Sequence, residues 1–227
     1  MIETYASQTA AADAAAAALE RGLAEGLRIR GRASLAATGG RSPAPVYQRL
    51  RTAPIDWARV VVTLTDERWT DPMGEHSNER LVREHLLTGA AGRAHLVPLW
   101  SQAAGPDAAA QAAEPLLAAL RPFDAVLLGM GEDGHIASLF PGSPVLAAGL
   151  DPNGARLALG VEEPHGAPPL ARITLTLAAL SAARSVVILI SGSEKRAVVE
   201  AALAGEELPV RALLCQEAGP VRVLWAP

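Results

Sequence analysis

The stretch VVVTLTDER, at residues 60–68, decides the fold class of this chain. Its first six residues are apolar or β-branched without alternation, which is typical of a strand that is buried on both faces. Strands of that kind belong to parallel sheets that carry helices on either side. The stretch then becomes polar at Asp66, Glu67 and Arg68, which predicts a loop directly after the strand.

Outward from this strand, similar short runs alternate with segments of helical character. The other runs predicted as strands are 33–37, 95–100, 125–128 and 186–190. The segments predicted as helices are 1–30, 43–51, 78–88, 106–120 and 194–204. This alternation predicts an α/β fold with a mostly parallel, twisted sheet flanked by helices, as in Rossmann-like proteins.

A segment rich in proline and glycine, 141–172, interrupts the alternation. Two short runs in and after it, 156–161 and 172–176, have strand character. A chain of 227 residues is most simply one domain with a single core. We therefore expect a single α/β domain over residues 1–227, in which 141–172 is an insertion that shapes one side of a site.

The composition excludes several classes of protein. Half of the residues are hydrophobic and the formal net charge is −4, which argues against disorder and against a nucleic-acid binder. The single Cys215 excludes an intramolecular disulfide framework, and no Cys/His cluster has zinc spacing, so no metal site is expected. No stretch reaches the roughly 18 apolar residues that span a bilayer, and the alanine run at 14–19 lacks the parts of a signal peptide. We expect a cytoplasmic protein without membrane contact.

Four of the predicted strands are followed at once by polar or glycine-rich loops, and ligands of open parallel sheets bind at the carboxyl ends of the strands. The first loop reads TGGRSP, at residues 38–43. Gly39 and Gly40 allow close approach of a ligand to the backbone, Arg41 adds positive charge, and Ser42 opens a helix whose free N–H groups favour a phosphate. The alternative is a plain strand-to-helix turn with a serine cap.

The second loop places Asp66 and Arg68 after the strand at 60–65. The guanidinium of Arg68 offers a two-pronged donor for a phosphate or a carboxylate. The alternative is an internal ion pair between Asp66 and Arg68. Ser77 and Asn78 stand where the next helix begins and are most simply its cap.

The third loop, GMGEDGH at residues 129–135, matches the G-x-G-x-x-G dinucleotide fingerprint in its letters. We reject that interpretation, because Glu132 and Asp133 would face a pyrophosphate and the following Pro141-Gly142 leaves little room for a long helix. The glycines instead present His135, the side chain best suited to proton transfer near neutral pH. Asp133 or Asp66 is then the carboxylate that orients the imidazole ring.

The fourth loop reads SGSEK, at residues 191–195, and contains the only lysine of the chain beside nineteen arginines. Ser193 is the expected N-cap, and Lys195 falls in the first helical turn. A cation there is disfavoured by the helix dipole, which favours a bound anion as the reason for its placement. The alternative is an exposed surface lysine.

Together these motifs resemble the 6-phosphogluconolactonase family. The matching pieces, in the family's order, are TGGRSP (38–43), TDERW (65–69) with a downstream SN (77–78), LLGMGEDGHIASLFPGSP (127–144), RITLTLAAL (172–180) and SGSEK (191–195). The resemblance implies a fold of the glucosamine-6-phosphate deaminase/ribose-5-phosphate isomerase type. It also implies hydrolysis of 6-phospho-D-glucono-1,5-lactone in the oxidative pentose phosphate pathway.

With the loop chemistry, the resemblance implies roles for individual residues. His135 is expected to be the general base, with Asp133 or Asp66 as its partner. The phosphate is expected to contact the Gly39-Gly40 loop and some of the polar side chains around it, namely Arg41, Ser42, Arg68, Arg172 and Lys195. No cofactor is expected, and the partner is a small sugar-phosphate lactone bound by a monomer or a small homo-oligomer.

Two other functions are compatible with the same fold. Glucosamine-6-phosphate deaminases share the GG-x-[ST]-P and DGHIA pieces, but they carry DEY-type and FNEPG-type stretches. This chain has Asp66-Glu67-Arg68 and SLFPG (138–142) there. A sugar-phosphate sensor usually carries a DNA-binding or partner-binding domain, and the roughly 30 residues before the first loop do not fit a helix-turn-helix.

Overall fold

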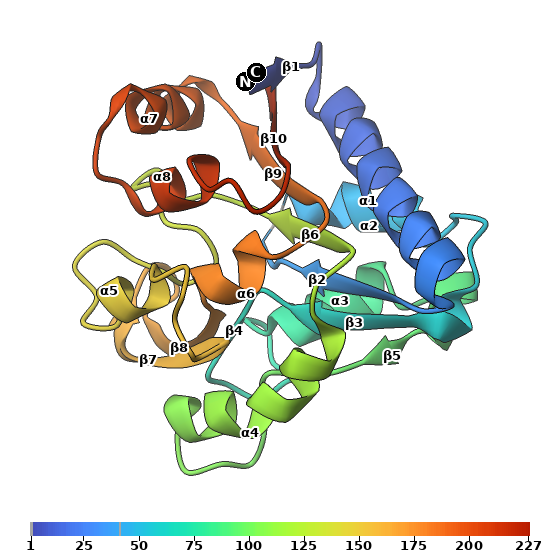
Figure 1. Cartoon of the computed structure of the whole chain (residues 1–227), viewed down its shortest axis with the longest axis horizontal. Helices are drawn as coiled ribbons and strands as arrows, with labels where there is room; N and C mark the ends of the chain where they lie inside the picture. The colour runs from blue at the N-terminus through green and yellow to red at the C-terminus, as the bar shows by residue number, and fades with distance from the viewer. Residues whose placement is uncertain (1, 41) are drawn as a thin grey trace.

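The computed structural model describes residues 2–40 and 42–227, apart from the side chains of residues 163–165. Its main sheet has seven parallel strands in the order β1-β10-β9-β6-β2-β3-β5 (Figure 1). They are β1 (Ile2–Thr4), β2 (Ala33–Ala37), β3 (Val60–Leu64), β5 (His95–Leu96), β6 (Ala125–Leu128), β9 (Val186–Ser191) and β10 (Val221–Ala226). Every residue of β2 and β6 is buried, as expected for strands covered on both faces. The predicted α/β fold with a mostly parallel sheet is confirmed.

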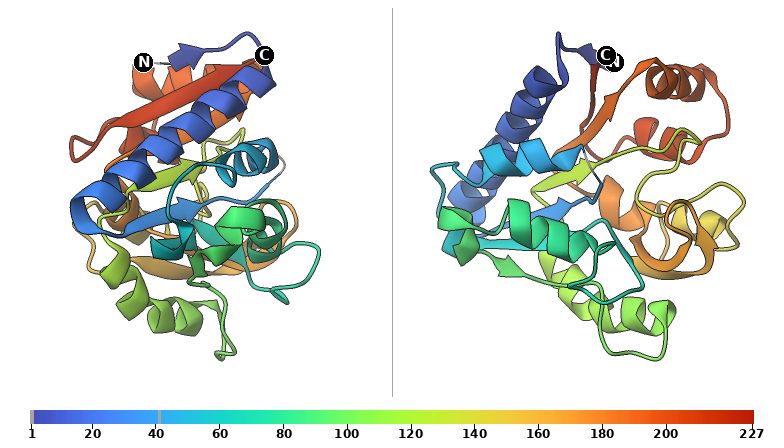
Figure 2. Two further views of the ribbon diagram at one scale, coloured as in Figure 1. Left: turned by 90° about the vertical axis from the view of Figure 1, so that its right-hand side faces the viewer. Right: turned by 180° about the vertical axis from the view of Figure 1, so that it is seen from behind.

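Helices surround the two sheets of the fold. They are α1 (Gln8–Arg30), α2 (Pro43–Leu50), α3 (Asn78–His85), α4 (Pro106–Leu120), α5 (Leu146–Gly149), α6 (Leu177–Ser181), α7 (Ser193–Ala204) and α8 (Pro209–Leu214), with short 3₁₀ helices η1 (Trp57–Arg59) and η2 (Gly89–Arg93). The long α1 lies across one face of the main sheet and packs against β2, β6, β9 and β10 (Figure 2). Its buried Leu19 and Leu23 face the sheet. No helix in the described part of the chain is both long and apolar enough to cross a bilayer.

A second, smaller sheet is antiparallel and has the order β4-β8-β7. Its strands are β4 (Asp66–Arg68), β7 (Ala158–His165) and β8 (Leu170–Leu175), and α4 packs against β7 and β8. The predicted loop at 66–68 is therefore wrong, because Arg68 pairs with Arg172 and Asp66 with Thr174. These polar residues form a strand because they pair with β8, about a hundred residues further along the chain. The local sequence around 66–68 gives no sign of that partner.

The predictions at the chain ends and at one edge also need correction. The helix predicted over 1–30 begins only at Gln8, where the Ser7 hydroxyl accepts a hydrogen bond from the Ala10 N–H at 3.2 Å. Before it, β1 pairs with β10, and the sequence pattern predicts neither of these two strands. The run 95–100 forms a strand only at β5. The short edge strands β1 and β5 form because a neighbouring strand is available for pairing. A local sequence pattern does not reveal such a neighbour.

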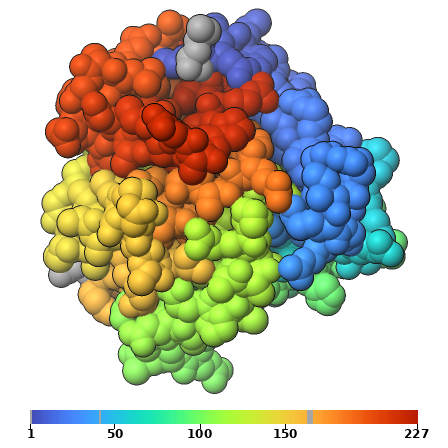
Figure 3. Space-filling view, in the orientation of Figure 1, coloured from blue at the N-terminus to red at the C-terminus, as the bar shows by residue number. Residues whose placement is uncertain are grey.

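The chain between β6 and α5 lies against α8. On the face shown in Figure 3, the yellow surface around α5 borders the red surface of α8. The N–H of Val210 in α8 donates a hydrogen bond to the Gly134 carbonyl at 2.9 Å. The loop that follows β6 is therefore tied to the last helix.

Glu67, in the middle of β4, explains why α3 begins at Asn78. Its fully buried carboxylate accepts hydrogen bonds from the Asn78 and Glu79 N–H groups, both at 2.8 Å, and from the Ser77 hydroxyl at 3.0 Å. The N–H of Arg68 donates to the same carboxylate at 2.7 Å. Burial raises the pKa of Glu67, and these four donors act against that shift. The carboxylate thus satisfies N–H groups that the first turn of a helix leaves unpaired.

Replacing Glu67 with Gln should lower the free energy of unfolding by about 3 kcal/mol. In the variant, an NH₂ group replaces one of the two carboxylate oxygens that accept hydrogen bonds from N–H and O–H groups. The buried donors on that side would lose their acceptor. Urea unfolding measures the change. The matched control is Glu84→Gln near the end of α3, where the carboxylate is half exposed and pairs with Arg80; its unfolding curve should match that of the unmodified chain. Equal curves for both variants would contradict the proposed role of Glu67.

Candidate active site

The carboxyl ends of β2, β3, β6 and β9 meet around one cavity of about 330 Å³. The predicted site residues that line it are Gly39, Gly40, Ser42, Asp66, Arg68, His135, Arg172 and Lys195. Asp133 contacts His135 beside the cavity, and the predicted Arg41 lies outside the described residues. The structure therefore brings residues of all four strand-end segments together at one place.

Asp133 orients the imidazole of His135. Its Oδ1 lies 2.5 Å from His135 Nδ1 and 3.2 Å from the His135 backbone N–H. A carboxylate at Nδ1 favours the tautomer that carries its proton there, which leaves Nε2 as a proton acceptor. The His135 side chain is 27% exposed, so water reaches it. Of the two carboxylates considered from the sequence, Asp133 makes this contact.

Gly131 lies directly beneath the His135–Asp133 pair. A Cβ on Gly131 would overlap the imidazole ring and the Asp133 carboxylate. The Gly131 N–H also donates to the His135 carbonyl at 2.9 Å, which closes the loop. After Gly134 the chain forms turns, and the next helix is the four-residue α5. Glycine at 131 therefore makes room for the histidine, and the loop lacks the helix that a dinucleotide site requires.

The carboxylate of Asp66 pairs with Arg172 from the second sheet. Asp66 Oδ2 lies 3.8 Å from Arg172 NH1 and accepts a hydrogen bond from the Ser138 hydroxyl at 2.7 Å. Both charged side chains are almost completely buried, at 7% and 4% exposure. The internal pair between Asp66 and Arg68 that the sequence left open does not form, and Arg172 takes the place of Arg68.

Both guanidinium groups in the cavity keep unused donors. Arg68 donates from NH1 to the His76 carbonyl at 2.7 Å, and Arg172 donates from NH2 to the Pro168 carbonyl at 3.1 Å. The Nε atoms of both residues are buried without a hydrogen-bond partner in the structure. Burial lowers the pKa of Arg172, but an arginine pKa starts so far above neutrality that the group stays charged. These cations favour an anionic ligand.

Lys195 completes the positive charge of the cavity. It is the third residue of α7, whose N-cap is Gly192; the prediction that Ser193 caps this helix is wrong, because Ser193 is already helical. No carboxylate of the described residues forms an ion pair with Lys195, which differs in this from its neighbour Arg196. An ammonium group in the first turn, without a protein counter-ion and facing a cavity, is placed for a bound anion.

Ser42 also lines this cavity. Ser42 is the N-cap of α2, yet its side chain makes no capping hydrogen bond. Gly40 borders open space, whereas a Cβ on Gly39 would overlap the carboxamide of Asn78. The loop before α2 therefore presents backbone and an unused hydroxyl to the cavity.

Asn78 is a cavity residue that the sequence reasoning treated only as part of a cap. Its Nδ2 donates to the Asp66 carbonyl at 2.9 Å and to Asp66 Oδ1 at 3.3 Å. The carboxamide oxygen therefore turns toward Gly39 and the cavity. The carboxamide of Asn78 packs closely against Gly39, and this contact joins two segments that are distant in the sequence. In the sequence, only the motif SN (77–78) pointed to Asn78.

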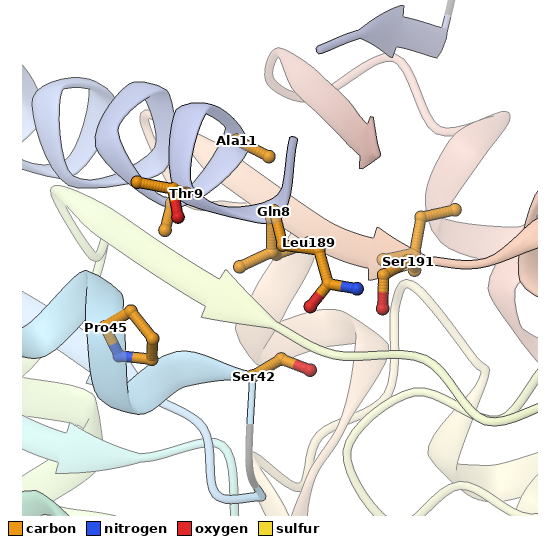
Figure 4. A pocket seen from close by; sticks show the side chains of 9 residues that line it. Gln8, Thr9, Ala11, Ser42, Pro45, Leu189 and Ser191 are labelled. Atoms are coloured by element: carbon orange, nitrogen blue, oxygen red, sulfur yellow. The ribbon is translucent and has the colours of Figure 1, made fainter. Parts of the chain in front are cut away.

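A second cavity, of about 410 Å³, lies between the starts of α1 and α2 and the end of β9 (Figure 4). It shares Ser42 and Leu189 with the strand-end cavity. The side chains of Gln8, Ser42 and Ser191 point toward its centre in Figure 4. None of the described residues that line it is charged, and no group of described His, Cys, Asp or Glu side chains could hold a metal ion. Of these two cavities, only the strand-end cavity is lined by charged and titratable side chains.

The chain is similar to known proteins over nearly its whole length. A family model described as glucosamine-6-phosphate isomerases/6-phosphogluconolactonase matches residues 6–225. A 6-phosphogluconolactonase of Caulobacter vibrioides is 44% identical, and the match covers 99% of this chain and 97% of the relative. The crystal structure of a 6-phosphogluconolactonase from Shewanella baltica superposes with a TM-score of 0.93 at 35% identity, covering 100% of this chain and 97% of the other.

A more distant structure shows how widely the fold is shared. A monomeric glucosamine-6-phosphate deaminase superposes with a TM-score of 0.78 at 20% identity, covering 99% of this chain and 96% of the other. That likeness concerns the fold alone. The family model and the similar relatives span nearly the whole chain, so this chain belongs to the glucosamine-6-phosphate isomerase/6-phosphogluconolactonase family.

Proposed function

We propose that this chain hydrolyses 6-phospho-D-glucono-1,5-lactone to 6-phospho-D-gluconate, the lactone-opening step of the oxidative pentose phosphate pathway, with His135 as general base. The observation that carries the proposal is the His135–Asp133 pair at the rim of a cavity lined by cations. The names of the similar relatives support a lactone hydrolase. A sugar-phosphate lactone supplies the anionic group that the cations require.

The phosphate would sit on the Gly39-Gly40 loop at the start of α2. A helix N-terminus with free N–H groups favours this group, and the unused Ser42 hydroxyl adds a donor. Lys195 and Arg68 supply charge, and the sequence places Arg41 beside them. Arg172, which pairs with Asp66 and is almost completely buried, serves either the phosphate or the developing oxyanion.

The reaction would proceed in two proton transfers through His135. Nε2 takes a proton from water while the water oxygen attacks the C1 carbonyl, and an oxyanion develops at C1. A cation or N–H donor of the cavity stabilises that charge. The C1–ring oxygen bond then breaks as the imidazolium returns the proton to the leaving ring oxygen. The product is a carboxylic acid, which ionises and releases the acid that an assay detects.

We also propose that residues 1–227 act as one α/β domain in the cytoplasm, alone or as a small homo-oligomer, without a metal or cofactor. In this proposal, segment 141–172 shapes one wall of the cavity. Ala167 and Arg172, near and at its end, line that cavity. The family model spans both sheets, which supports a single unit.

Replacing His135 with Ala should reduce lactone hydrolysis by about 10²- to 10⁴-fold, the usual contribution of one general base. Freshly generated 6-phosphogluconolactone is offered, and acid release is followed above the spontaneous rate. The matched control is His95→Ala in the edge strand β5, which should keep full activity because this histidine is exposed and outside the cavity. Near-normal hydrolysis by His135→Ala would contradict the proposed base.

The same assay distinguishes the alternative functions. Glucosamine 6-phosphate is offered in parallel, and ammonia release is measured. Acid release alone supports the lactonase, ammonia release would establish a deaminase, and neither product from the unmodified chain would favour a sensor.

Replacing Lys195 with Arg should impair turnover or substrate binding at least several-fold, although the charge is kept. A planar guanidinium does not reproduce the compact ammonium of lysine at a phosphate or oxyanion. Steady-state kinetics gives kcat and KM for the variant. The reverse change next to it, Arg196→Lys, is the control and should leave both constants unchanged, because Arg196 pairs with Glu200 on the helix surface. Unchanged kinetics in Lys195→Arg would make Lys195 an ordinary surface residue.

A further inference from the structure

Phe140 is a buried aromatic residue that contacts polar residues of the site. Its side chain is only 3% exposed. The other phenylalanine of the chain, Phe123, is fully buried in the main apolar cluster. Phe140 differs from Phe123 in that its ring contacts a titratable and a charged side chain of the site.

The ring of Phe140 contacts both the imidazole of His135 and the guanidinium of Arg172. The His135 and Phe140 ring centroids are 4.4 Å apart and the planes are tilted by 45°. The Cζ atom of Arg172 lies 5.2 Å from the Phe140 centroid, over the ring. An aromatic face carries partial negative charge, so it attracts a guanidinium above it. One hydrophobic side chain thus touches both the proposed base and an almost completely buried cation.

Hydrogen bonding alone does not fix the imidazole plane. Among the described residues, the hydrogen-bond partner of the imidazole nitrogens is Asp133, at Nδ1, and the Asp133 side chain is 49% exposed. A single hydrogen bond at one ring atom allows the ring to pivot about it. Packing against Phe140 supplies a second contact, on the ring itself, and two contacts define an orientation.

The backbone at Gly166 limits how far the Phe140 ring can move. A Cβ on Gly166 would lie 3.0 Å from Phe140 Cε1 and 3.2 Å from Arg172 NH2. The turn at Gly166 therefore lies close over both the ring and the guanidinium. Arg172 is held in addition by Asp66 and by the Pro168 carbonyl. The Phe140 ring therefore packs against a guanidinium that other groups hold in place, and it limits the positions that the His135 ring can adopt.

We propose that Phe140 is a positioning residue that fixes the imidazole of His135 relative to Arg172, so that Nε2 stays aimed at the cavity. The inference rests on the proposed function, in which His135 is the base. It concerns the alignment of a catalytic group and not substrate binding, so it predicts an effect on kcat. Small misplacements of a reacting group can cost on the order of 10²-fold in rate.

The test compares Phe140→Leu with Phe123→Leu, which removes the same ring atoms from the core. Phe140→Leu should lower kcat for the lactone by about 10- to 100-fold, with KM changed by less than about threefold, because the binding groups remain. Phe123→Leu should lower the melting temperature, while the folded enzyme keeps kcat within about twofold. If Phe140→Leu does not fold, Phe140→Met replaces it, because methionine fills irregular space. Equal kcat values for the Phe140 and Phe123 variants would overturn the inference.

Combination with Asp133→Asn tests whether Phe140 acts through His135. If both residues orient the same ring, the loss of kcat in Phe140→Leu/Asp133→Asn should be clearly smaller than the product of the two single losses. The pair Phe123→Leu/Asp133→Asn should lose the full product. Independent, multiplicative losses for Phe140 and Asp133 would overturn the positioning role.

These outcomes are distinct from failure of the proposed function. Near-normal hydrolysis by His135→Ala would remove the base itself, and with it the reason for positioning it. Loss of activity in His135→Ala together with full kcat in Phe140→Leu would leave the proposed function intact and overturn only the role of Phe140.

Discussion

The buried carboxylate of Asp66 is the constraint on which the site depends. It accepts hydrogen bonds from Ser138 and Asn78 and pairs with Arg172. These partners come from the loop after β6, the start of α3 and the second sheet. A buried charge is tolerated only when its partners surround it, so these segments must assemble together. The need to surround the buried Asp66 charge with partners therefore brings together the segments that form this wall of the cavity.

The course of residues 60–68 explains how two sheets come to share a site. The chain leaves the parallel sheet at the end of β3 and enters the antiparallel sheet as β4 after a single residue. The parallel strands supply loops and helix starts suited to a phosphate. Arg172 comes from β8 of the second sheet, which runs antiparallel to β4. The base, His135, lies on the loop after β6, where Phe140 and Asp133 contact it. Binding and proton transfer thus come from different elements that meet at one strand edge.

The sequence predicted best what depends on local pattern. The strands at 33–37 and 125–128 and the helix at 106–120 agree with β2, β6 and α4 residue for residue, because continuous burial or a proline-started alanine helix leaves a clear signal. Topology then explains the convergence of the strand-end loops, since the carboxyl ends of parallel strands share one edge. The choice of Asp133 over Asp66 as the partner of His135 required coordinates.

Features that depend on distant partners were beyond sequence reasoning. The strand character of 66–68 exists only through pairing with β8, and β1 exists only through β10. The buried Glu67 looked like one more loop carboxylate, although it caps α3 from eleven residues away. The ion pair that the sequence left open for Asp66 was with Arg68, two residues away, whereas Asp66 pairs with Arg172 of β8. In each case the deciding contact joins residues from separate elements.

A crystal structure with bound 6-phosphogluconate tests the central claim most directly, because the product carries both the phosphate and the C1 carboxylate. The expected result places the phosphate within hydrogen-bond distance, about 3 Å, of the Gly39-Gly40 loop and Lys195. It also places the C1 carboxylate beside His135 Nε2. A product bound in reverse, with its phosphate at His135, or bound in the cavity at Gln8 and Ser191, would contradict the assigned roles.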